Sequence, residues 1–166
     1  MDYKEAKSEF IQAWGTLGSN WGINRTMSQI HALLLASSRA LSAEEIMEEL
    51  QISRGNANMN IRALIDWGLV KKELVPGERK EFFRGSKGIE AIARQIARER
   101  RKRELVPIID TMQKLDAFEA KDKEGKVFKK VVSDMLKFSK QLDMAIEKFE
   151  RSDKNWFYRT AMKLLK

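Results

Sequence analysis

The chain has 166 residues, of which 43% are hydrophobic and 34% charged, and its formal net charge is +8. This size and composition fit one soluble domain, or a small domain with helical extensions. The absence of cysteine excludes disulfides and thiolate metal sites, and the excess of lysine and arginine favours a polyanionic partner, although an anionic membrane surface would also satisfy it.

The N-terminal residues predict an amphipathic helix over 2–18, because aromatic and apolar residues recur there at helical spacing. Gly15, Gly18 and Gly22 are expected to break this pattern. Two interpretations remain open: the helix packs on its own core, or it packs against a second subunit.

A second helix is predicted over 24–37, with Ile30, Leu33 and Leu34 buried. His31, the only histidine of the chain, lies in this helix. A lone histidine at such a position is expected to be structural rather than a ligand or a base.

Residues 41–67 predict two helices that cross steeply. Ser42 can cap the first helix, and Glu45 three residues later completes a capping box. The second helix is predicted over 53–67, with Gly68 as its left-handed stop. Because only about three residues join the two helices, they are expected to form a helix-turn-helix.

The second of these helices has a predicted buried side, formed by Ala57, Ile61, Leu64 and Ile65. Its opposite face is small, amide-rich and cationic, with no acidic residue before Asp66, and consists of Gly55, Asn56, Met59, Arg62 and Ala63, flanked by Arg54 and Asn58. Asparagine can pair with adenine and arginine with guanine in the major groove, and a helix N-terminus can bind phosphate. We therefore expect DNA contacts from Ser53, Arg54, Gly55, Asn56, Asn58, Met59 and Arg62.

A β-hairpin is predicted over residues 69–84. Pro76 and Gly77 suit the two central positions of a type II turn. Arg79 and Lys80 lie beside the tip, where cations can reach backbone phosphate or the minor groove. We therefore predict that this hairpin is a wing and that Arg79 and Lys80 contact DNA.

A long helical pattern follows over 88–117, and Pro107 inside it is expected to kink or break the helix. The basic run 98–104 is interpreted either as a solvated helix surface or as a site of phosphate contact or of charge pairing across a dimer. After a polar connection, residues 126–150 predict another amphipathic helix. A short basic-aromatic helix is expected over 156–166, where it would either pack on the preceding helices or lie on a membrane surface.

Together these elements predict a mainly α fold with a small β-hairpin. The expected architecture is a winged helix-turn-helix with N- and C-terminal helical dimerisation extensions. Its expected divisions are an N-terminal dimerisation helix (1–22), a DNA-binding domain (23–86) and a C-terminal helical dimerisation region (87–166).

Five motifs occur in a characteristic order: WGINRTMSQIHALL (21–34), LSAEEI (41–46), ISRGNANMN (52–60), LIDWGLV (64–70) and VPGERKE (75–81). This set resembles the MarR superfamily, and specifically its GbsR-like branch. The resemblance implies a homodimeric transcription regulator whose N- and C-terminal helices build the dimer interface. Each subunit would place its recognition helix in one of two successive major grooves of a pseudo-palindromic site.

Some members of this branch repress osmoprotectant genes and respond to choline-like molecules. For such a small-molecule effector, Trp14, Trp21 and Trp67 would supply an aromatic cage around a quaternary ammonium. The alternative is that these tryptophans pack in the core.

We therefore expect a sequence-specific regulator of double-stranded DNA, acting as a homodimeric repressor. A cytoplasmic location is expected because no signal-peptide pattern or long apolar run is present. The alternative is a non-catalytic protein-interaction module on the same scaffold. An enzyme is not expected, since the chain has one histidine, no phosphate-cradling glycine loop and no metal-spaced ligands, so no catalytic residue, cofactor or metal site is predicted.

Overall fold

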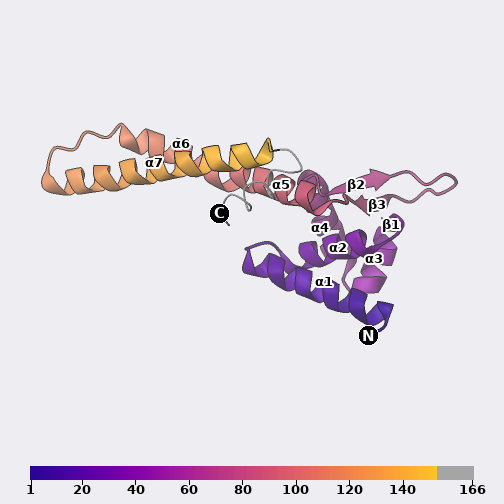
Figure 1. Ribbon diagram of the computed structural model, residues 1–166. Helices are drawn as coiled ribbons and strands as arrows, with labels where there is room; N and C mark the ends of the chain where they lie inside the picture. Colours follow the sequence, from indigo (N-terminus) through magenta and orange to yellow (C-terminus); the bar gives the residue numbers. More distant parts are fainter. Residues whose placement is uncertain (153–166) are drawn as a thin grey trace. The chain divides into compact units, whose positions relative to one another are not determined.

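The computed structural model describes residues 1–152 and divides into two compact units, residues 1–92 and the residues from 93 onward (Figure 1). The first unit contains α1 (Tyr3–Asn20), α2 (Arg25–Ala36), β1 (Leu41–Ser42), α3 (Ala43–Leu50), α4 (Arg54–Asp66), β2 (Val70–Glu73) and β3 (Phe82–Gly85). Helix α5 (Ile89–Arg100) crosses the boundary. The second unit continues with the π-helical stretch η1 (Arg101–Leu105), α6 (Val106–Asp116) and α7 (Lys123–Glu150). The predicted fold class, mainly α with a small antiparallel sheet, is confirmed.

Helix α1 continues through two glycines that were expected to interrupt it. It runs to Asn20, and only Gly22, with φ +74°, has a backbone that ends it. Gly15 and Gly18 are buried against α2 instead. A Cβ added at Gly18 would overlap the hydroxyl of Ser28 and lie 2.7 Å from its Cβ. The prediction of a break was therefore wrong, because these glycines serve close helix packing.

Alanine at Gly18 is expected to destabilise the fold by about 1–3 kcal/mol, since it overpacks the contact between α1 and α2. Gly55 is the matched control. It lies in an exposed turn of α4, with nothing within 4 Å of an added Cβ, so alanine there should stabilise by up to about 1 kcal/mol. Urea unfolding followed by circular dichroism measures both. Equal free energies of unfolding for the two variants would contradict the packing role of Gly18.

The core of the first unit is centred on α2. Ile30, Leu33 and Leu34 are buried as predicted, and so is His31, at 2% exposure. The largest side chains with less than 2% exposure are Ile30, Leu33, Leu34, Ile46, Leu64 and Val70. They come from α2, α3, α4 and β2, so the helix-turn-helix and the sheet share one core with α2.

The local signals at the start of α3 are confirmed. The Glu45 N–H donates to Ser42 Oγ at 3.3 Å, and the Ser42 N–H donates to Glu45 Oε2 at 2.7 Å. Ser42 also belongs to the short strand β1, which sequence patterning missed because two residues carry no alternation. Strand β1 pairs with β3 through Leu41 and Phe83, giving a sheet of order β1-β3-β2. The first unit is thus a winged helix-turn-helix with a third strand.

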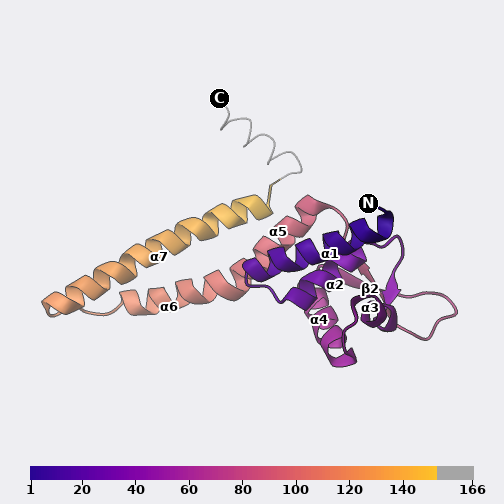
Figure 2. The same ribbon diagram turned by 90° about the horizontal axis from the view of Figure 1, so that it is seen from below.

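Pro107, where a kink or break is predicted, lies just after a π-helical stretch, η1, and the helical backbone continues through it into α6. Because proline has no N–H to donate, the helix widens just before it, and the Val106 N–H bonds to the Arg101 carbonyl. The connection after α6 ends at Asp122, which caps α7 by accepting from the Gly125 N–H at 2.6 Å. Both views show α6 and α7 side by side and antiparallel (Figures 1 and 2). The helix expected over 156–166 lies outside the described residues.

Candidate nucleic-acid interface

Helix α4 is anchored by one side. Ala57, Ile61 and Leu64 are buried as predicted, whereas Ile65 is half-buried. Asn60, which the apolar pattern missed, is also buried at 3% exposure. The helix is capped at its start by Ser53, whose Oγ accepts from a backbone N–H at 3.3 Å.

The opposite side of α4 is open to solvent. Six of the seven residues expected to contact DNA are exposed: Ser53, Arg54, Gly55, Asn58, Met59 and Arg62. Met59 is the most apolar of them and is 60% exposed. Arg54, Asn58 and Arg62 follow at intervals of four residues, so their side chains form one row along the helix.

Asn56 differs from the other six. It is half-buried, and its Oδ1 accepts from the buried Asn60 Nδ2 at 2.7 Å. Its own Nδ2 lies 3.5 Å from Thr26 Oγ1 on α2. The amide of Asn56 therefore already has partners that tie α4 to α2. That Asn56 contacts a DNA base stays a prediction. The sequence signal that could have indicated its internal hydrogen bonds is Asn60, which shares the helical spacing of the buried apolar residues of α4.

The wing consists of β2, β3 and the loop between them, which extends beyond the sheet in Figure 1. The Glu78 N–H donates to the Val75 carbonyl at 3.1 Å, and Gly77 has φ +85°, as the predicted type II turn requires. Arg79 and Lys80 follow this turn and are exposed.

Ion pairs join the two sides of the wing at its base. Arg84 on β3 donates to both carboxylate oxygens of Glu73 on β2, one of them at 3.0 Å. This hydrogen bond lowers the pKa of Glu73 and raises that of Arg84. A second ion pair joins Lys72 of β2 and Glu81, the residue before β3, at 2.5 Å. The strands are thereby held in register, while Arg79 and Lys80 at the tip have no partner in the described part of the chain.

The arginines of the described chain fall into two groups. Most have a side-chain partner: Arg25 with Gln12, Arg39 with Glu45, Arg84 with Glu73, Arg98 with Glu150, Arg100 with Glu104, Arg101 with Asp143, Arg103 with Glu99 and Arg151 with Glu147. Arg94 also interacts. Within residues 1–152 only Arg54, Arg62 and Arg79 make no hydrogen bond or ion pair. These three are the arginines expected to contact DNA.

The arginines of the basic run 98–104 belong to the group that has side-chain partners. Arg101 donates to Asp143 on α7 at 2.6 Å, and Arg100 and Arg103 pair within their own helical stretch. The hydrogen bond to Asp143 lowers the pKa of that carboxyl. These cations are thus engaged in ion pairs of the same chain.

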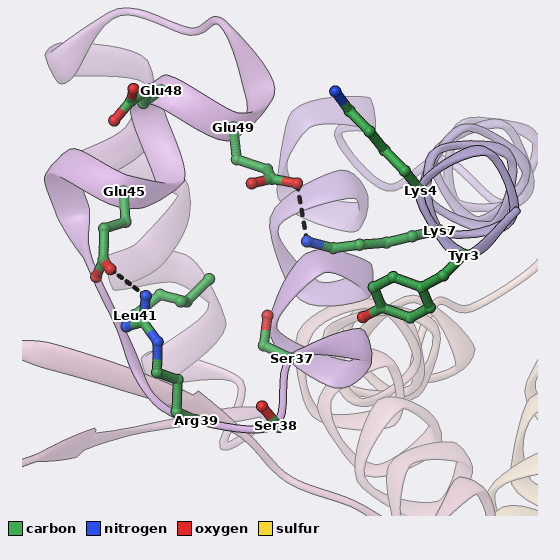
Figure 3. Close-up of a pocket in the computed structure, with 10 residues that line it drawn as sticks. All are labelled: Tyr3, Lys4, Lys7, Ser37, Ser38, Arg39, Leu41, Glu45, Glu48 and Glu49. Carbon is green, nitrogen blue, oxygen red and sulfur yellow. Dashed lines mark hydrogen bonds and ion pairs between the residues drawn. The ribbon is translucent and has the colours of Figure 1, made fainter.

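A polar hollow of about 620 Å³ lies beside the helix-turn-helix (Figure 3). Two ion pairs cross its lining: Lys7 Nζ with Glu49 Oε1 at 2.8 Å, and Arg39 with Glu45 at 2.5 Å. Its lining is Tyr3, Lys4, Lys7, Ser37, Ser38, Arg39, Leu41, Glu45, Glu48 and Glu49. Lysines of α1 therefore face glutamates of α3, which links the N-terminal helix to the first helix of the helix-turn-helix.

The hydrogen bond from Arg39 lowers the pKa of Glu45 to about 2. A carboxyl whose pKa is depressed by folding stabilises the folded state above its ordinary pKa, and that contribution is lost as the pH falls toward about 2. The start of α3 is therefore expected to stay intact across the neutral and mildly acidic range.

The three tryptophans come from different places in the first unit. Trp14 lies in α1 and is half-buried, with ring centroids 5.7 Å from Phe10 and 6.1 Å from His31. Trp21 follows the end of α1 and is 55% exposed. Trp67 is half-buried at the end of α4. The aromatic cage stays a prediction, and none of the three lines the hollow of Figure 3.

Among residues 1–152, no group of three histidine or acidic side chains could hold a metal ion, and no helix is long and apolar enough to cross a membrane.

Residues 21–81 match the model of the MarR family. This stretch extends from the residues that precede α2 into the loop of the wing. A solved structure described as "Crystal Structure of a transcriptional regulator" is similar to the chain, with a TM-score of 0.57 and 20% sequence identity, over 89% of this chain and 99% of that chain. No curated protein sequence matches the chain. At this identity the structural likeness supports the winged-helix fold.

Proposed function

We propose, from the match of residues 21–81 to the MarR family, that the chain is a winged-helix transcription regulator of the GbsR-like branch. It binds double-stranded DNA as a homodimer and acts as a cytoplasmic repressor. The similar solved structure, itself titled a transcriptional regulator, supports this assignment. In this proposal residues 1–22 and 87–166 serve dimerisation, and residues 23–86 bind DNA.

One observation carries the proposal: the arginines without a partner in residues 1–152 are those of the α4 face and the wing tip. An exposed guanidinium presents its donors in a fixed fork that matches a phosphate or a guanine edge. Within residues 1–152, carboxylates pair with most of the other arginines. On a solvated surface that binds no ligand, arginines with and without carboxylate partners would be expected to occur side by side.

The contacts can be assigned by position. Arg54, Asn58 and Arg62 form the row that would enter the major groove and meet base edges or nearby phosphates. Ser53 and Gly55 lie at the N-terminus of α4, where free N–H groups favour a phosphate and the missing side chain of glycine allows close approach. The wing would lie on the DNA backbone or in the minor groove.

Alanine at Arg79 is expected to weaken binding to all DNA sequences alike and to lower the salt slope, d log K/d log[salt], by about 1, because one phosphate contact is lost. The measurement is a titration of labelled duplexes at several salt concentrations. Alanine at Arg151 is the matched control, since it removes the same charge from an arginine already paired with Glu147. Equal salt slopes in the two variants would contradict a specific role for the wing.

The competing assignment is a protein-interaction module on the same scaffold. It predicts binding that needs a protein partner, depends little on salt and survives alanine at Arg79. The DNA titration therefore separates the two assignments directly.

A small-molecule effector is part of the proposal. A quaternary ammonium would be held by Trp14, Trp21 and Trp67 through cation–π contacts. Trp21, more than half exposed, is the ring among them that such a ligand reaches first from solvent.

A further inference from the structure

The exposed side of α4 carries one large apolar side chain at its centre. Met59 is 60% exposed, whereas the other large apolar residues of this helix are buried or half-buried, namely Ile61, Leu64 and Ile65. Met59 is two residues from the buried Ala57 on one side and two from the buried Ile61 on the other. At about 100° per residue, its side chain therefore points about 160° away from both.

The neighbours of Met59 along the helix leave room around it. Gly55, one turn before, has no side chain, and nothing lies within 4 Å of a Cβ added there. Ala63, one turn after, carries only a methyl group and is half-buried. Arg62 and Asn58, both exposed, lie on one flank. The thioether side chain of Met59 is thus the long uncharged group on a face of small, cationic and amide residues.

Exposure alone does not assign a role to Met59, because single exposed apolar residues are common on protein surfaces. Its surroundings select the partner. Arg54 and Arg62, on the same side of α4, have no partner among residues 1–152. Asp66, the acidic residue of this helix, is its last residue. A surface that covers Met59 must therefore also accept unneutralised guanidinium groups, which favours a polyanion.

The major groove of DNA restricts what Met59 can contact. Phosphates line the walls of the groove and base edges form its floor, so a side chain at the centre of an inserted helix face meets base edges. Methionine has no N–H or O–H to offer, and a polar base edge buried beneath it would lose its hydrogen bonds to water. The apolar group that bases present in this groove is the C5-methyl of thymine.

We propose that Met59 reads a thymine in each half-site, through contact between its side chain and the C5-methyl group of the base. The inference rests on the proposed function, which places α4 in the major groove, and it adds the identity of one base and the atoms by which that base is recognised. The arginines and asparagines hold the helix in the groove, and Met59 is a specificity-determining residue.

The test removes the methyl group from the DNA. The full-length protein first selects its site from a random library of duplexes. Each thymine of the half-site is then replaced in turn by deoxyuridine, which keeps the hydrogen-bonding groups of thymine but lacks its methyl. At one position, this change should weaken binding by wild type about fourfold, the effect of one buried methyl group. The same change in both half-sites should weaken it about fifteenfold.

Variants of Met59 identify the side chain that contacts the methyl group. Met59→Ala should bind the thymine and deoxyuridine duplexes with affinities that differ by no more than about 1.5-fold, because the two changes remove the same contact. Met59→Leu should keep a difference of about threefold, since leucine supplies an apolar side chain of similar size. Circular dichroism establishes that both variants keep their helices.

Leu74→Ala is the matched control. Leu74 is 92% exposed and lies in the loop of the wing, which is proposed to contact the DNA backbone or the minor groove. Thymine presents no methyl group in the minor groove. Whatever this variant does to overall affinity, it should therefore keep the fourfold difference between thymine and deoxyuridine.

The possible failures can be told apart. If wild type selects a site but tolerates deoxyuridine at every position, or if that site contains no thymine, the inference is overturned and the proposed function stands. If the difference persists in Met59→Ala, another residue contacts the methyl group, which also overturns the inference. A wild type that binds no duplex at all would overturn the proposed function together with the inference.

Discussion

Replacing Arg54 and Arg62 together with alanine is expected to weaken binding to a specific DNA site by about a hundredfold or more, since each well-placed arginine contact contributes about 1–3 kcal/mol. Both side chains are exposed, lie in the same row of α4 and have no partner in the described chain. The change should leave stability almost unaltered, because neither guanidinium holds any other element in place.

Fluorescence anisotropy measures this loss of affinity, at one fixed salt concentration, with one duplex that contains the specific site and one of unrelated sequence. The matched control is the pair Arg100→Ala and Arg103→Ala, which removes two charges from arginines that are paired with Glu104 and Glu99. If both double variants lost affinity equally, only net charge would matter. An unchanged affinity in Arg54→Ala/Arg62→Ala would remove α4 from the interface.

Lowering the pH from about 6.5 to 4 is expected to destabilise the fold by up to about 3 kcal/mol through His31. Burial lowers the pKa of His31 to about 4 from its ordinary 6.5, because the charged imidazolium would have to be desolvated. Among residues 1–152, its Nε2 is buried without a hydrogen-bond partner. The unfolded chain therefore binds a proton first as the pH falls, so the stabilisation present above pH 6.5 is lost toward pH 4.

The effect of His31 is best measured between about pH 6.5 and 5. His31 is the only histidine, and carboxylates titrate mostly below this pH range. Urea unfolding at several pH values gives the profile. His31→Leu, of comparable size and without a titrating group, should flatten the profile in this window. Identical profiles for the variant and wild type would show that His31 is not the group responsible.

Local sequence signals predicted local structure well. Ser42 and Glu45 form their capping box, Gly68 has φ +68° after α4, and the Pro76–Gly77 turn forms as expected. Each of these signals depends on residues within a few positions of one another. Hydrophobic spacing likewise predicted the burial of Ile30, Leu33 and Leu34 in α2 and of three of the four buried residues of α4. It did not predict the burial of Met27, Ser28 and Ala32 in α2.

Features that depend on contacts distant in sequence were missed. Gly18 looked like a helix breaker, because its packing partner Ser28 belongs to another helix. Strand β1 exists only through its pairing with β3, about forty residues later. Asn56 has the appearance of a free amide in the sequence, because its hydrogen-bond partner Thr26 lies 30 positions earlier, on another helix.

The pairing of arginines in the candidate interface likewise could not be predicted from the sequence. In the sequence alone, Arg62 and Arg101 cannot be distinguished, because both are cations within segments of helical spacing. The fold places Asp143, which is 42 positions later in the chain, beside Arg101, whereas Arg62 has no partner among the residues that the structure describes. Which arginines remain free to bind DNA is therefore a property of the tertiary structure.

The most direct test of the central claim, that the exposed face of α4 reads DNA and is presented twice, is selection of bound duplexes from a random library by the full-length protein. Wild type should enrich an inverted repeat whose half-site centres lie about one helical turn apart, or a multiple of it. The Arg54→Ala/Arg62→Ala variant, selected in parallel, should enrich none. A library in which wild type enriches no motif, or the same motif as that variant, would contradict the claim.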